Sequence, residues 1–205
     1  GDRYVTYSSR INRAVLATRG KIILYKGEPI YAAFFSTSNG RTENSEDVFS
    51  KSFPYLRSVP SPWDEKSPRF LNEKTLTLDD FFQRIEKATG KRVAVPASSG
   101  RNWIRILERT SGKRIKTLQI GDQTFTGRQV REALGLSSAD FTWKIESGRI
   151  RFQSRGYGHG VGMSQWGAHL LAHQGKSAEE IIRYYYRGVE TGDMGPVLNR
   201  VYEKN

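Results

Sequence analysis

Two segments of the sequence carry side chains that could do chemistry. The first, STSNGRTENSED at residues 36–47, offers hydroxyl, amide and carboxyl groups within twelve residues. Glu43 and Glu46 could act as general acid and base, because glycosidic cleavage needs a carboxyl held protonated beside the leaving oxygen. The neighbouring Thr, Asn and Ser residues do not supply the apolar burial that raises a carboxyl pKa. Capping and turn formation are therefore the favoured roles of this segment.

The second segment is SRGYGHGVGMSQWGAHLLAHQG, residues 154–175, which is rich in glycine and then becomes helical. Its G-x-G-x-G-x-G spacing differs from that of a dinucleotide-binding loop, and it lacks the lysine of a P-loop. His159 stands among small neighbours that would let a ligand approach closely. The favoured alternative is an imidazole that hydrogen-bonds to the loop backbone.

His169 and His173 stand four residues apart, which is a metal-ligand spacing on a helix. The sequence HLLAHQG lacks the glutamate of a zinc-protease helix, and histidines near a helix C-terminus also favour its negative end. The chain has no cysteine, which removes disulfides and thiolate ligands. We therefore expect no metal and no other cofactor.

The composition restricts the class of partner. With 33 Lys and Arg against 21 Asp and Glu, the formal charge is +12, so the surface attracts polyanions such as nucleic acid, anionic lipid or wall polymers. The basic residues are spread along the chain and form no nucleic-acid-binding motif, so nucleic acid is a minor alternative. No stretch is long and apolar enough for a membrane span, and the first ten residues lack a signal-peptide core.

Periodicity predicts an α+β fold. A first helix capped by Ser8 or Ser9 should end at Gly20, and a hairpin should pair residues 21–25 with 30–36. Residues 37–70 read as a long structured loop. A helix capped by Ser177 and Glu180 should be the last element.

A small α+β insertion is expected at about residues 72–140, within a single domain of 205 residues. Its expected elements are a helix from Thr77 to Gly90, strands at 103–107 and 114–120, and a helix opened by a Thr126–Gln129 capping box. A hairpin of residues 141–146 and 149–153 should follow, and then a helix from about Ser164 to Gly175.

Three stretches together resemble the stage II sporulation protein D family, relatives of the bacterial amidase enhancers. They are IYAAFFSTSNGRTENSEDVFSKSFPYLRSVPSPWD, TFTGRQVREALGLSSADF and GYGHGVGMSQWGA, which together span nearly the whole chain. The resemblance implies a lytic transglycosylase that cuts peptidoglycan glycan strands. In such enzymes one glutamic acid protonates the glycosidic oxygen and then helps the muramic C6 hydroxyl to attack, giving a 1,6-anhydro end.

The sequence departs from the family pattern at the catalytic residue. The family glutamate lies in a segment resembling V-V-A-S-E-M-P, and no such segment precedes Ser8. We therefore expect an N-terminally truncated chain that is inactive alone, with Glu43 as the first alternative acid. Some relatives bind zinc through cysteine and histidine, but Ser36 occupies the corresponding region here, so zinc is not carried over.

The resemblance also implies a set of substrate-binding residues. Tyr55 would stack on a sugar ring, and Arg57 would pair with a lactyl or stem-peptide carboxylate. Sugar hydroxyls would bond to Ser36, Ser38, Asn39 and Glu43. The glycine-rich segment would form a groove wall with Tyr157, His159, Ser164 and Gln165, while Met163 and Trp166 would hold the next helix to the core.

The family resemblance further implies the setting. Members act outside the cytoplasm at the sporulation septum and engulfing membrane, anchored by an N-terminal membrane helix and working with a wall amidase. The alternative function is a non-catalytic module that binds peptidoglycan and stimulates an amidase, as the enhancer relatives would. A basic groove bearing aromatic side chains suits both functions.

Overall fold

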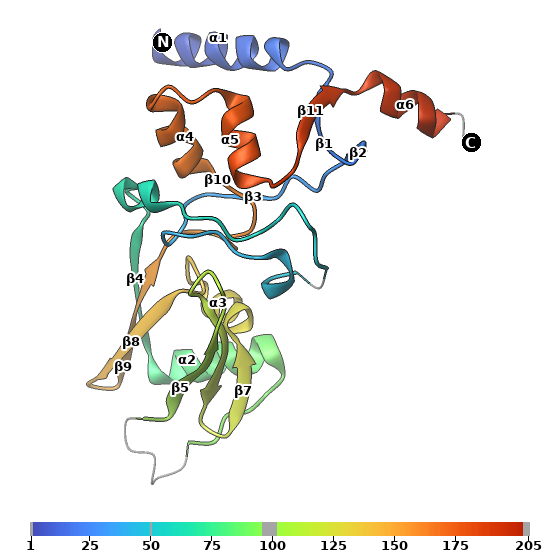
Figure 1. Cartoon of the computed structure of the whole chain (residues 1–205). Helices are drawn as coiled ribbons and strands as arrows, with labels where there is room; N and C mark the ends of the chain where they lie inside the picture. Colours follow the sequence, from blue (N-terminus) through green and yellow to red (C-terminus); the bar gives the residue numbers. More distant parts are fainter. Residues whose placement is uncertain (1, 50, 96–101, 203–205) are drawn as a thin grey trace. The chain divides into compact units, whose positions relative to one another are not determined.

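A computed structural model gives the structure of the protein and describes residues 2–49, 51–95 and 102–202 (Figure 1). In these residues helices mix with four small, mainly antiparallel sheets, which confirms the α+β class. The chain divides into two compact units, here called the terminal unit (residues 1–31 and 188–205) and the central unit (residues 32–187).

The terminal unit is built around strand β1 (Lys21–Tyr25). It lies between β2 (Glu28–Pro29) and β11 (Glu190–Asp193), antiparallel to both. The turn between β1 and β2 has positive φ at Lys26 (52°) and Gly27 (78°), as a tight hairpin turn requires. Helices α1 (Asp2–Ala17) and α6 (Gly195–Tyr202) complete this unit.

Three expectations about these elements were wrong. Ser8 and Ser9 do not cap the first helix, because α1 begins at Asp2 and both serines lie inside it. Residues 30–36 do not form the second hairpin strand, because pairing with β1 stops after the two residues of β2. The helix capped by Ser177 is not the last element, because β11 and α6 follow it.

Two three-stranded sheets and two helices form most of the central unit. One sheet has the order β4 (Leu71–Thr77), β9 (Arg149–Arg155), β8 (Phe141–Glu146). The other has the order β5 (Ile104–Arg109), β6 (Ile115–Ile120), β7 (Gln123–Thr126). Helices α2 (Leu78–Thr89) and α3 (Gly127–Leu134) pack with them around a core that includes Phe81, Leu118, Leu134 and Phe152.

The caps of these helices follow the prediction. The Thr77 side chain accepts a hydrogen bond from the Asp80 N–H, and Thr126 with Gln129 forms a complete capping box. Gly90 and Gly135 take the left-handed conformation that ends each helix. Strand β4 was not predicted, because the sequence LNEKTLT has only one strongly buried position, Leu76.

The rest of the central unit joins the two segments that stood out in the sequence. Strand β3 (Phe34–Phe35) pairs in parallel with β10 (Met163–Ser164), which leads into α4 (Gln165–His173) and α5 (Ala178–Tyr185). The expected loop of residues 37–70 is irregular apart from the short 3-10 helices η1 (Ser45–Asp47) and η2 (Pro62–Lys66). Ser164 caps α4 by accepting a hydrogen bond from the Gly167 N–H, as predicted.

Asp64 in η2 links several segments of this part of the unit through hydrogen bonds. Its buried carboxylate accepts hydrogen bonds from the Ser38 N–H at 2.8 Å, from the Ser61 hydroxyl at 2.6 Å and from the Ser164 hydroxyl. The Ser61 hydroxyl also lies 2.7 Å from the Tyr185 hydroxyl. One carboxylate therefore holds the long loop, the start of α4 and α5 in register.

Candidate functional site

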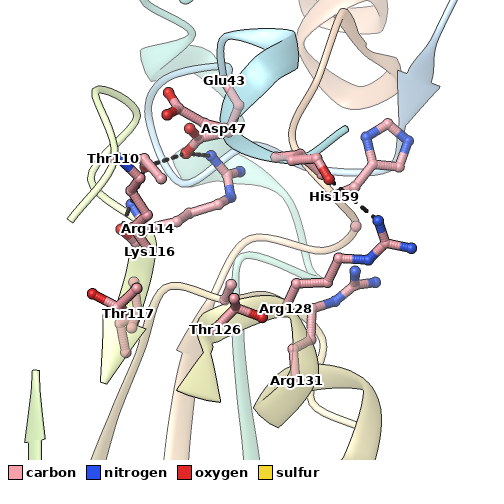
Figure 2. A pocket seen from close by; sticks show the side chains of 14 residues that line it. Glu43, Asp47, Thr110, Arg114, Lys116, Thr117, Thr126, Arg128, Arg131 and His159 are labelled. Carbon is pink, nitrogen blue, oxygen red and sulfur yellow. Dashed lines mark hydrogen bonds and ion pairs between the residues drawn. The ribbon is translucent and has the colours of Figure 1, made fainter. Parts of the chain in front are cut away.

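A cavity of about 250 Å³ lies in the central unit where three segments meet (Figure 2). Its walls come from residues 43–48, from β6 with the start of α3, and from the Gly158–His159 part of the glycine-rich loop. We call it the arginine pocket, after Arg114, Arg128 and Arg131, which line it. Lys116 adds a fourth cationic side chain.

Glu43 and Arg114 form a buried ion pair on one wall. The Glu43 side chain is 0% exposed and that of Arg114 is 3% exposed. Glu43 Oε1 accepts from Arg114 Nη1 and from the Thr110 hydroxyl, both at 2.9 Å, as Figure 2 shows. Burial raises the pKa of Glu43, although Arg114 acts in the opposite direction. The expectation that this carboxyl lacks a burying environment was therefore wrong, because the burial comes from residues distant in the sequence.

The buried pair is only partly satisfied. Among the described residues, Glu43 Oε2 and Arg114 Nε and Nη2 have no hydrogen-bond partner, although all three atoms are buried. The Arg114 guanidinium lies against Gly160, where an added Cβ would be 2.5 Å from Arg114 Cζ. Gly160 has a φ of +88°, so the glycine-rich loop follows the guanidinium closely because it carries no side chain there.

Arg128 and Arg131 project into the pocket from α3 (Figure 2). Arg128 donates to the Val48 carbonyl at 3.2 Å and pairs with Glu132 at 2.9 Å. Within the described part of the chain, Arg131 makes no ion pair and its buried Nε has no hydrogen-bond partner. Burial lowers the pKa of Arg131; the charge of Glu132 acts in the opposite direction, and the charges of Arg114 and Arg128 lower the pKa further.

His159 lies beside these arginines at the opposite wall. Its Nδ1 accepts a hydrogen bond from the Val161 N–H at 3.1 Å, which confirms the predicted bond between imidazole and loop backbone. Its ring lies 5.8 Å from the Phe35 ring and 5.4 Å from the Phe49 ring. Burial lowers the pKa of His159, with Arg131, Arg114 and Arg128 adding to the effect. The imidazole is therefore neutral near pH 7.

Glu46 and Arg57 form an ion pair, and neither residue lines the arginine pocket. Arg57 donates to the two carboxylate oxygens of Glu46 at 2.6 Å and 2.5 Å. This pairing lowers the pKa of Glu46 to about 2, so its carboxyl is ionised at neutral pH and cannot serve as a general acid. Arg57 was expected to bind a carboxylate of the substrate. In the structure its guanidinium is paired with the carboxylate of Glu46 instead.

Several other residues that were expected to bind substrate are buried or hydrogen-bonded within the protein. Tyr55 is buried at 7% exposure and offers no free ring face for stacking on a sugar. Ser38 and Ser164 are buried in the Asp64 network. Asn39 donates from Nδ2 to the Gly112 carbonyl and to Asp140, both at 3.0 Å.

The remaining expected residues are more accessible. Tyr157 is 40% exposed, with the Arg69 guanidinium 5.1 Å from its ring centre. Gln165 is exposed at the start of α4, and Ser36 is half-buried, its hydroxyl 3.3 Å from that of Thr37. Trp166 and Met163 are half-buried, Trp166 at the start of α4.

Two histidines of α4, His169 and His173, have the spacing of metal ligands. The rings of His169 and His173 are 4.5 Å apart on the exposed side of α4. No third histidine, carboxylate or cysteine completes a metal-binding group there or elsewhere in residues 2–49, 51–95 and 102–202. Over the same ranges, no helix has the length and apolarity needed to span a membrane.

The sequence is similar to proteins of one sporulation family. A stage II sporulation protein D of Bacillus subtilis (strain 168) is 43% identical over 204 residues, covering 100% of this chain and 57% of the relative. A protein of the same name from Bacillus amyloliquefaciens matches to the same extent. The chain belongs to the stage II sporulation protein D family. No protein-family model matches it.

The family is related to the amidase enhancers. An amidase enhancer of Bacillus subtilis is 28% identical to this chain over 230 residues, covering 89% of this chain and 32% of the enhancer. The chain spans only about three fifths of the length of its sporulation protein D relatives, at 57%.

The segments that carry the family resemblance meet at the arginine pocket. The Thr37 N–H donates to the Tyr157 carbonyl at 3.0 Å, and the Glu43 N–H donates to the Gly160 carbonyl at 2.8 Å. Arg128 and Arg131 belong to the third segment, TFTGRQVREALGLSSADF. Neither arginine was predicted as a site residue, and the signal that could have found them is their place within that segment.

Proposed function

We propose that this chain is the glycan-holding part of a lytic transglycosylase that cleaves peptidoglycan of the septal wall during sporulation and engulfment. Family membership supports the proposal, and so does the arginine pocket, which is the single observation on which it chiefly rests. A cationic pocket on a chain of charge +12 suits an anionic wall polymer. The enzyme would act outside the cytoplasm, held by a membrane anchor and paired with a wall amidase.

The reaction proposed for the whole enzyme needs one protonated carboxyl at the glycosidic oxygen. A general acid must come within about 2.6–3.2 Å of the atom that it protonates. Glu43 is fully buried and bonded to Arg114 and Thr110, and Asp47 is the other carboxylate that lines the pocket in the described residues. Because Glu43 cannot touch a bound glycan in this arrangement, we propose that the acid belongs to a segment outside this chain.

A second function fits the same pocket. The similarity to an amidase enhancer and the inaccessible Glu43 carboxyl favour a module that binds peptidoglycan without cleaving it and stimulates a wall amidase. This alternative and the transglycosylase predict the same binding surface. They differ in whether any form of the protein produces 1,6-anhydro sugar ends.

The deciding experiment compares this chain with the complete extracytoplasmic part of the natural protein. Each is incubated with purified glycan strands, and the new sugar ends are identified by mass spectrometry. Anhydro ends from the longer protein alone would support the proposal. Anhydro ends from this chain would place the acid on a carboxylate of the pocket, with Glu43→Gln as the first variant to test and Asp47→Asn as its comparison. Binding with no new ends from either protein would support the enhancer function.

A further inference from the structure

We infer that the arginine pocket binds a carboxylate carried on a small apolar group, with Arg131 as its principal ligand. The inference rests on the proposed function only for the source of that carboxylate. In a peptidoglycan strand the source would be the lactyl group of a muramic acid that carries no stem peptide, since the peptide is attached through that carboxyl, or the C-terminal alanine of a stem peptide. Both present a methyl group beside a carboxylate.

Arg131 is the residue that points to a missing anion. It is half-buried, and in the described residues it has neither an acidic partner nor a hydrogen bond for its buried Nε. A guanidinium taken partly out of water normally has a carboxylate, a carbonyl or a phosphate as partner, because the desolvated charge is otherwise costly. Arg128, one turn earlier on α3, already donates to the Val48 carbonyl and pairs with Glu132. Arg131 therefore lacks the kind of partner that Arg128 has.

Arg131 differs from the other cationic side chains of the pocket in its lack of an ion pair. Arg114 pairs with Glu43, Lys116 with Glu108 at 2.7 Å, and Arg128 with Glu132 at 2.9 Å, whereas Arg131 makes no ion pair in the described residues. Glu43 is held by Arg114 at 2.9 Å, and Asp47 accepts from the Ser111 hydroxyl at 3.3 Å. Burial lowers the pKa of Arg131; Glu132 acts in the opposite direction, and the positive charges of Arg114 and Arg128 add to the lowering. A bound anion would relieve that repulsion without displacing any existing ion pair.

The shape and lining of the pocket favour a carboxylate over a phosphate. Its apolar walls include Val48, Ile115 and Ala139, so a methyl group could be buried beside the charged end. The volume of about 250 Å³ matches roughly eight water molecules at about 30 Å³ each, which suits a short acyl group.

The test measures binding of small probes to this chain, with no need for glycan cleavage. The probes are N-acetylmuramic acid, N-acetyl-D-alanine, the methyl esters of both, and inorganic phosphate. Affinities come from calorimetry, and the site is located by NMR shifts of the pocket amides. We expect the acids to bind and the esters to bind at least tenfold more weakly. The stronger of the two acids identifies the source of the carboxylate.

Arg131→Met removes the proposed ligand while keeping most of the side-chain volume. We expect it to weaken binding of the acids by roughly tenfold to a hundredfold, the usual value of a charge-assisted hydrogen bond. Arg84→Met is the matched control. Arg84 is an exposed arginine on α2 that does not line the arginine pocket, and its replacement changes the net charge by the same amount. Arg131→Lys keeps the charge and shows whether a loss in Arg131→Met reflects misfolding.

Three results would overturn the inference. They are equal weakening by Arg131→Met and Arg84→Met, equal binding of acids and esters, or phosphate binding as tightly as the acids. Binding of the acids by a protein that yields no anhydro ends in any form would reject the proposed transglycosylase and leave the carboxylate site standing. Anhydro ends from a protein that binds none of the acids would do the reverse.

Discussion

Glu43 and Arg114 lie 2.9 Å apart and are both buried, Glu43 in the serine-rich loop (residues 36–47) and Arg114 in the segment that leads into β6. The pair connects residues that are far apart in the sequence at the wall of the arginine pocket. A buried pair of this kind contributes little net stability compared with an apolar pair, but losing one partner leaves a buried charge uncompensated. The pair therefore fixes the position of Arg114 in the pocket wall.

Glu43→Gln should destabilise the protein by about 3–5 kcal/mol, because the buried Arg114 charge loses its carboxylate. The double variant Glu43→Gln/Arg114→Met should recover much of that loss. Urea unfolding at pH 7 measures both. The matched control is Glu46→Gln, which breaks the more exposed pair with Arg57 and should cost about 1 kcal/mol or less. A double variant no more stable than Glu43→Gln would contradict the pairing argument.

Gly160→Ala should destabilise the protein more than Gly175→Ala, although the two glycines have nearly the same φ, +88° and +87°. The conformational cost of alanine at positive φ is about 1–2 kcal/mol at both positions. At Gly160 the new methyl would also meet the Arg114 guanidinium, whereas nothing lies within 4 Å at Gly175. That clash should add roughly 1–3 kcal/mol. Urea unfolding of the two variants side by side checks the difference, and equal losses would show that Arg114 can move aside.

Local signals predicted the elements that local residues determine. The Thr126–Gln129 capping box and the cap at Ser164 depend on side chains within one helical turn, so the sequence contains the whole interaction. The pairing of Lys21 with Asp193 depends on strands from opposite ends of the chain, and β11 has few β-branched residues to reveal it. The prediction therefore succeeded for the starts of α2, α3, α4 and α5, and it missed β11 and its pairing with β1.

For the candidate site, too, the sequence predicted some residues and missed others. Glu43 and His159 were predicted, and both line the pocket, because unusual local composition marked their segments. The helical pattern of α3 shows which positions are apolar, as at Val130, but cannot show what its polar side will face. Arg131 gains its role only when the serine-rich and glycine-rich loops fold over α3. Burial of Glu43 has the same origin.

Asp64→Asn should cost about 1–3 kcal/mol, because an amide nitrogen would replace one of the two oxygens that accept hydrogen bonds from Ser38, Ser61 and Ser164. The control is Glu65→Gln in the same 3-10 helix, where the side chain is exposed and the change should stay within about 0.5 kcal/mol. Thermal unfolding measures both variants. If Asp64→Asn were as stable as Glu65→Gln, the carboxylate would not be what fastens the loop to α4.

His159 should make stability fall as the pH is lowered. Burial holds its folded pKa below the ordinary value of 6.5, so the unfolded chain binds the proton first. Its contribution is complete above about pH 6.5 and is lost as the pH falls through the folded pKa. Glu43 acts in the opposite sense, because its folded pKa is raised and its contribution is lost as the pH rises.

The difference between His159→Gln and the parent protein isolates the histidine, since Glu43 is common to both. Gln can still accept from the Val161 N–H, so the loop bond has a replacement. Urea unfolding between pH 7.5 and 5 should show a shallower loss in the variant, by at most about 1.4 kcal/mol per pH unit, the value for one proton. His169→Gln changes an exposed histidine and should keep the parent slope. Parallel slopes for His159→Gln and the parent would mean that the imidazole stays solvated at the edge of the pocket.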